Sequence, residues 1–209
     1  MNIIYLLIGW GLGLFSPLII DRIKSHFQRK ELKQAFFAEL KEIRYRMVCL
    51  VSDLAQGLGV HDRELYEWVY KHCVEYSGTY PKEYIIKFIE TLLKSSDKEI
   101  SALCQIAKDK ENVGLSLKRF STPFVDSKID SLSLFDIKFQ TMFHEIRAHI
   151  DLLNQEIDNA DYCFKRTFDI TDPRNFETNH ENLMNSYQNV KNESYRIVNM
   201  ISNLISQYS

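Results

Sequence analysis

Apolar side chains recur at alternating steps of four and three residues in two stretches of the C-terminal half. The first stretch holds Phe139, Phe143, Ile146, Ile150, Leu153, Ile157, Ala160 and Phe164. The second holds Leu183, Tyr187, Val190, Ser194, Ile197, Ile201, Leu204 and Tyr208. This spacing puts each set on one face of a helix. With only a short connection between them, we expect two long antiparallel helices.

The boundary between these two helices is predicted from helix breakers and caps. Thr171-Asp172-Pro173 should end the first helix, and Thr178-Asn179-His180-Glu181 matches a capping box that should begin the second. Each seam can pack within one chain or between subunits, and the sequence leaves both alternatives open.

A third seam is predicted between residues 21 and 56, where no glycine or proline interrupts the chain. Its apolar positions are Phe36, Leu40, Ile43, Met47, Leu50 and Leu54. We expect a stalk helix over these residues that ends at Gly57-Leu58-Gly59, where glycine can adopt the left-handed cap.

Shorter helices are predicted over residues 62–76, from Pro81 to about residue 93, and from Ser96 to about residue 108. The first should bury Leu65, Trp68, Val69 and Cys73, and the second Ile85, Phe88, Ile89, Leu92 and Leu93. Ser96-Asp97-Lys98-Glu99 matches a capping box, and residues 110–131 should form a long irregular connection. The predicted fold is all-α, with an anchor (1–20), a stalk (21–56) and a helical bundle (57–209).

The first 20 residues carry no charged side chain. A helix of about 20 residues is long enough to span a bilayer once. A cleavable secretory signal is the alternative, but a basic start and a small-residue cleavage site are both missing. Lys and Arg outnumber Asp and Glu by five to two over residues 21–33. Basic flanks stay in the cytoplasm, so we expect a bacterial inner-membrane protein with its N-terminus outside and its bundle in the cytoplasm.

Small and weakly polar residues share one strip of the predicted anchor and suggest self-association. Gly9 and Gly13 form a G-x-x-x-G pair that lets helices approach closely in lipid. With several copies around an axis, the same strip can line a passage whose cytoplasmic mouth carries a ring of carboxylates. A plain dimer contact would look the same. The candidate residues are Asn2, Gly9, Gly13, Ser16, Pro17 and Asp21.

The basic residues after the anchor are candidates for contacts with anionic headgroups, although such flanks also serve only to orient an anchor. They are Arg22, Lys24, Arg29, Lys30 and Lys33.

Composition narrows the chemistry further. Hydrophobic residues make up 45% of the chain, as in an ordinary globular protein, and the formal net charge is -2. A body that is acidic outside the basic flank argues against broad nucleic-acid binding. The cysteines show no C-x-x-C spacing, and His144 and His149 miss the H-E-x-x-H spacing. No catalytic motif is present, so we expect neither an enzyme nor a metal or cofactor.

The irregular connection offers the clearest candidate ligand contacts. Lys118-Arg119-Phe120, with Phe124 nearby, combines cations with aromatic rings, a pairing that can hold phosphates and stack bases. Arg44 and Arg46 on the stalk are further candidates.

Residues 6–10, 13–17, 21–23 and 31–40 resemble small bacterial single-pass proteins of anti-phage defence loci, including the Hailong type with its DNA-gated channel effector. The resemblance implies a companion enzyme that makes a nucleotide or short nucleic-acid signal, and a homo-oligomeric membrane protein that responds by opening a pore. The competing hypothesis is a non-conducting tether that holds a helical interaction module at the lipid bilayer.

Overall fold

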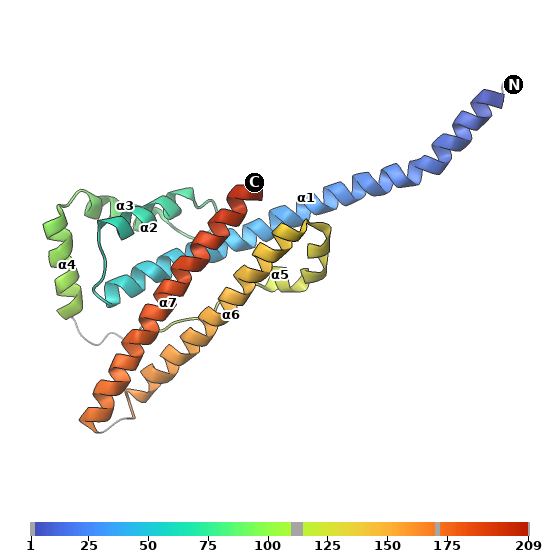
Figure 1. Ribbon diagram of the computed structural model, residues 1–209. Helices are drawn as coiled ribbons and strands as arrows, with labels where there is room; N and C mark the ends of the chain where they lie inside the picture. Colours follow the sequence, from blue (N-terminus) through green and yellow to red (C-terminus); the bar gives the residue numbers. More distant parts are fainter. Residues whose placement is uncertain (1–2, 110–114, 170–171, 209) are drawn as a thin grey trace.

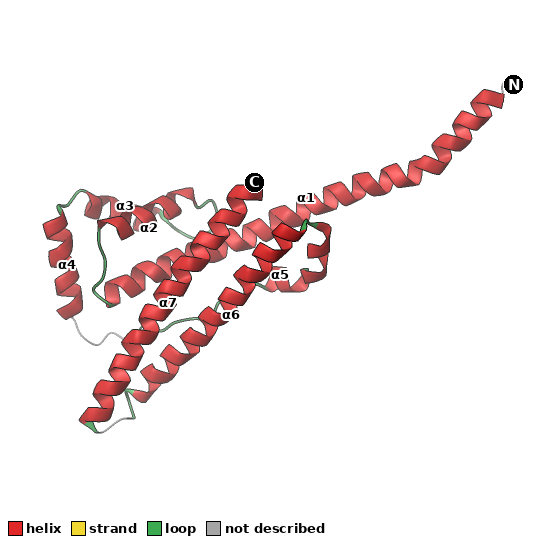
Figure 2. Cartoon of the chain, viewed as in Figure 1, coloured by secondary structure: helices red, strands yellow, loops and turns green. Residues whose placement is uncertain are grey.

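The computed structural model describes residues 3–109, 115–169 and 172–208, and within them the chain forms helices and loops without a strand (Figure 2). Long antiparallel helices pack into one bundle with a common hydrophobic core. The prediction of an all-α bundle built on long antiparallel helices is therefore confirmed.

Helix α1 (Ile3–Gly57) is a single helix of 55 residues. Its first part extends away from the other helices, and its second part crosses the bundle (Figure 1). Inside the bundle the predicted seam is buried except at Leu50, which is half-buried, and Phe36, Met47 and Leu54 are fully covered. The predicted glycine stop is confirmed: Gly59 has φ 62, and its amide donates to the Gln56 carbonyl at 3.1 Å.

Helices α6 (Ile137–Arg166) and α7 (Pro173–Tyr208) form the long antiparallel pair. Residues late in α6 meet residues early in α7: the Asn179 side chain donates to the Cys163 carbonyl at 2.8 Å. Toward the other end, His149 contacts Glu193. The predicted seams are buried except at their last positions, Phe164 and Tyr208, which are half-buried. The seams pack against each other and against α1 within one chain.

The predicted start of the last helix at Thr178 is wrong. α7 begins at Pro173, and Asp172 caps it: its carboxylate accepts from the Arg174 amide at 3.0 Å and its carbonyl from the Phe176 amide at 3.0 Å. Proline fits the first helical position because its missing N–H has no partner there anyway. Thr178 lies in the second turn, where its hydroxyl donates to the Arg174 carbonyl.

Helices α2 (Arg63–Glu75), α3 (Glu83–Leu93) and α4 (Asp97–Asp109) lie beside the C-terminal part of α1, away from the N-terminus (Figure 1). The capping box of α4 is confirmed, because the Ser96 amide donates to the Glu99 carboxylate at 2.6 Å. The predicted inward face of α3 is wrong at Phe88, which is 48% exposed, since α3 packs mainly on α2. α3 also begins at Glu83, two residues after Pro81.

The predicted irregular connection contains two short elements, α5 (Pro123–Ser127) and the 3-10 helix η1 (Ile129–Leu134). Thr122 makes no side-chain cap for α5. Glu39 on α1 replaces it, with its two carboxylate oxygens accepting from the Phe124 and Val125 amides, both at 2.9 Å. A cap supplied by a distant helix leaves no local sequence signal, so this helix was not predicted.

Within the described part of the chain, no helix is both long enough and apolar enough to cross a membrane. In the predicted anchor the described side chains include only Trp10, Gly13 and Ile20; residues 1–2 and the remaining side chains before residue 20 lie outside the description.

Candidate functional site

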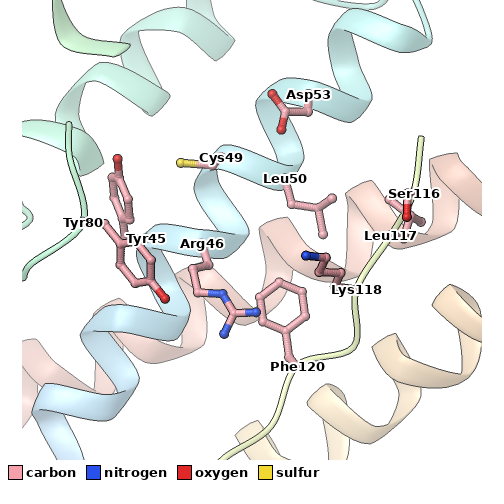
Figure 3. Close-up of a pocket in the computed structure, with 10 residues that line it drawn as sticks. All are labelled: Tyr45, Arg46, Cys49, Leu50, Asp53, Tyr80, Ser116, Leu117, Lys118 and Phe120. Carbon is pink, nitrogen blue, oxygen red and sulfur yellow. The ribbon is translucent and has the colours of Figure 1, made fainter. Parts of the chain in front are cut away.

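A groove of about 330 Å³ lies on the side of α1, between the α2–α3 connection and the chain before α5 (Figure 3). It combines cationic, aromatic and apolar side chains with one carboxylate. The lining residues are Tyr45, Arg46, Cys49, Leu50, Asp53, Tyr80, Ser116, Leu117, Lys118 and Phe120.

The floor of the groove is one face of α1. Arg46, Cys49, Leu50 and Asp53 follow one another at steps that keep them on one side of a helix, and Figure 3 shows them along successive turns. The opposite face of the same turns, with Val48, Val51 and Ala55, is buried in the bundle. The groove floor and the core therefore belong to one rigid helix.

One wall of the groove is an extended segment, residues 115–120, which we term the strap. Two side chains from other helices hold its backbone. Near its start, the Tyr187 hydroxyl accepts from the Leu115 amide at 2.9 Å and donates to the Leu115 carbonyl at 3.1 Å. At its end, the buried Asn154 side chain accepts from the Phe120 amide at 2.8 Å and donates to the Phe120 carbonyl at 2.9 Å.

The cationic part of the groove is formed where the strap meets α1. The Arg46 guanidinium lies 4.8 Å from the centre of the Phe120 ring, within the range of a cation–π interaction. Lys118 is exposed beside them, and the described residues offer it no ion-pair partner. An anion placed here meets two cations, Arg46 and Lys118.

Three ionisable groups of the groove, Tyr45, Cys49 and Asp53, have raised pKa values that favour their neutral forms. Burial raises the pKa of the Cys49 thiol to about 11, so the thiol stays protonated at neutral pH. Surrounding protein also raises the pKa of Asp53, although its side chain reaches the surface. The tyrosine hydroxyl of Tyr45 donates to the Pro81 carbonyl at 3.0 Å, and burial raises its pKa. Among the described groove residues, the thiol of Cys49 and the hydroxyl of Tyr45 are therefore both protonated at neutral pH.

Two of the candidate ligand contacts lie elsewhere. Arg119 points away and pairs with Asp158 at 3.6 Å on the surface. Arg44 is only 8% exposed and faces the α2–α7 side of α1, where it donates to the Ser202 hydroxyl at 3.2 Å. Glu75 lies 3.9 Å from it. The structure thus brings together Arg46, Lys118 and Phe120, and separates Arg44 and Arg119 from them.

The candidate membrane-surface residues divide into two groups. Arg29 and Lys33 lie on the bundle: Arg29 covers the Phe135 ring at 5.4 Å, and Lys33 donates to the Tyr208 carbonyl at 2.7 Å. The second group, Arg22, Lys24 and Lys30, is exposed on the surface of α1.

The candidate residues of the anchor strip are described only in part. Gly13 and Asp21 are exposed, and a side chain added at Gly13 would meet nothing within 4 Å. Asn2 lies outside the described residues, as do the side-chain environments of Gly9, Ser16 and Pro17.

Several residues of the site were not predicted: Tyr80 and Asp53, which line the groove, and Asn154 and Tyr187, which hold the strap. Asn154 did leave a signal, because a carboxamide beside Leu153 in an apolar seam is a buried polar group that needs a partner. Its partner is the strap, 34 residues earlier in the chain, and sequence spacing alone cannot identify such a pair.

Comparison with family models, with curated proteins and with solved structures gave no match to this chain. Any functional argument therefore depends on the residues and on the geometry described above.

Proposed function

We propose that this chain is an oligomeric membrane effector of bacterial antiviral defence, in which the uncharged first 20 residues cross the inner membrane and the helical bundle lies in the cytoplasm. In this proposal the bundle senses a nucleotide or nucleic-acid signal from a companion enzyme. The anchors of several copies respond by forming a pore. The length of the uncharged segment and the basic flank support the single span.

The observation that carries the proposal is the continuity of α1. The same helix contains the uncharged segment, the exposed basic residues and the groove floor from Tyr45 to Asp53. A helix without a break transmits tilt or rotation, so a ligand that moves α1 against the strap would also move the N-terminal segment.

The groove supports a small anionic ligand with an aromatic part. A phosphate fits beside Arg46 and Lys118, and a base can stack on the exposed ring of Tyr80. Asp53, two helical turns from Arg46, can accept a hydrogen bond from an amino group of the ligand.

A vesicle experiment tests the proposal. The full-length protein is reconstituted in dye-filled vesicles, and leakage is measured with and without short single-stranded DNA and mononucleotides. We expect ligand-dependent leakage that disappears when residues 1–20 are replaced by an unrelated single-pass helix of equal length. Lack of leakage under every ligand condition, or equal leakage after the replacement, would refute the channel.

Variants of the groove connect this response to the site. Arg46→Ala and Lys118→Ala should each weaken the ligand response by about tenfold or more, since a hydrogen bond to a charged group contributes about 1.5–3 kcal/mol. Lys128→Ala removes an exposed lysine on the other side of α5 and serves as the matched control. An equal response from all three variants would place the sensor elsewhere.

A non-conducting tether is the second candidate, and exposed aromatic residues on α3 favour it. Tyr84 is 83% exposed and Phe88 is 48% exposed, one helical turn apart on the surface. Such rings suit a protein contact. A tether would keep its function after the anchor replacement, whereas a channel would lose it.

A further inference from the structure

The part of α1 that extends from the bundle carries an apolar stripe. Ile20, Ile23 and Phe27 are 59%, 52% and 59% exposed, and their steps of three and four residues align them on one face. The other faces of the same turns carry charged residues, including Arg22, Lys24 and Arg29. A single narrow stripe of this kind fits a partner helix, whereas lipid would surround the whole helix.

The bundle lies on the opposite side of α1 from this stripe. The contacts of Arg29 with Phe135 and of Lys33 with Tyr208 mark the side that faces the bundle. At 3.6 residues per turn, this side is roughly half a turn away from Ile20 and Phe27. The stripe is therefore open to a second molecule.

The open side continues along α1 in both directions. Toward the bundle it passes through three exposed residues, Glu31, Gln34 and Ala38. Toward the N-terminus, Gly13 precedes Ile20 by seven residues, so it occupies the same position one heptad earlier. Gly13 is exposed with open space around it.

We propose that α1 pairs in parallel with α1 of a second copy of this chain along Gly13, Ile20, Ile23 and Phe27. This inference rests on the proposed function, because an anchor in the membrane forces both helices to run in the same direction. In that register each His26 lies across from the partner's Glu31, the position of complementary pairs beside a coiled-coil seam. The bundles then lie on the outer sides of the pair, because Arg29 and Lys33 contact the bundle from the other side of α1.

Cysteine crosslinking in membranes tests the pairing. Ile23→Cys and Phe27→Cys are placed singly in the full-length protein, with Arg22→Cys and Ser25→Cys as controls on the opposite side of the same turns. After mild oxidation we expect covalent dimers from the two stripe variants, several-fold more than from the controls. The unmodified protein gives the background from the native cysteines. Equal crosslinking at all four positions, or none at Ile23 and Phe27, would overturn the pairing.

A charged substitution gives a second measurement that does not depend on disulfide formation. Phe27→Glu should lower the mass of the detergent-extracted protein while its helix content by circular dichroism stays that of the wild type, because residue 27 lies outside the bundle core. An unchanged mass would contradict the pairing. The Phe27→Cys variant can also be labelled with a water-soluble maleimide. If its cysteine is protected from the label only in vesicles and does not crosslink, lipid covers the stripe and the pairing is wrong.

These outcomes separate the pairing from the effector function. If the stripe variants crosslink but the protein causes no leakage, the channel proposal is refuted and the pairing is supported. If the wild type causes ligand-dependent leakage but the stripe variants do not crosslink, the pairing is refuted and the channel proposal is supported.

Discussion

Asn154 on α6 binds both backbone groups of Phe120, accepting from its amide at 2.8 Å and donating to its carbonyl at 2.9 Å. The ring of Phe120 then lies against the Arg46 guanidinium. One buried carboxamide thus fixes the strap on the groove side of α1, and links the α6–α7 pair to the candidate ligand site.

Asn154→Ala should destabilise the protein, because it leaves a buried amide and a buried carbonyl without partners. Each such group costs about 1–3 kcal/mol. Urea unfolding of the detergent-solubilised full chain, followed by circular dichroism, measures the change. Asn159→Ala, at an exposed position of the same helix, is the matched control and should stay near the wild type. Equal losses in the two variants would contradict the role of Asn154.

Glu39→Ala should release the start of α5. Its carboxylate accepts from two amides that a helix of five residues cannot satisfy itself, and loss of a cap costs about 0.5–2 kcal/mol. Hydrogen exchange should speed up at the Phe124 and Val125 amides. Glu67→Ala, on the exposed face of α2, should leave their exchange unchanged. Persistent protection of both amides in the Glu39 variant would show that another group caps α5.

His72 should make folding sensitive to mild acid. Burial, with Arg44 nearby, lowers its pKa from 6.5 to about 4 in the folded protein. Between these two pKa values the unfolded chain binds a proton at His72 and the folded chain does not. The free energy of unfolding therefore keeps its full value above about pH 6.5 and decreases as the pH falls toward 4. The loss attributable to this group is on the order of 3 kcal/mol.

The pH dependence of unfolding in His72→Gln checks this expectation. The variant should lose part of the slope of unfolding free energy against pH between about pH 4 and 6.5. A slope equal to that of the wild type would show that other groups cause the acid sensitivity.

Cys49 should alkylate slowly although it lines the groove. Its pKa is raised from 9.0 to about 11, so near pH 8 the reactive thiolate fraction is about a hundredfold below that of an unshifted thiol. Peptide mapping by mass spectrometry after iodoacetamide treatment, with a small free thiol as the reference, gives the rate. A rate similar to the reference would contradict the burial of the thiol, and a groove ligand should slow the reaction further.

The agreement between sequence and structure depends on how local each signal is. The seam from Phe139 to Ala160 and the Ser96–Glu99 capping box involve neighbours within a few turns, and both are present. The start of α7 was misplaced because Asp172-Pro173 and Thr178–Glu181 are both valid helix starts by sequence. α5 was missed because its cap, Glu39, is 85 residues away.

By itself, the sequence determined that the chain is helical, where its apolar faces lie, and that its first 20 residues are uncharged next to a basic flank. These properties follow from helical periodicity and composition, which act over short distances along the chain. Only the tertiary structure decided that Arg46, Lys118 and Phe120 share a groove while Arg44 and Arg119 do not. Neighbouring arginines on a helix point in different directions, and the strap is positioned by hydrogen bonds from Asn154 and Tyr187 on helices that come later in the chain.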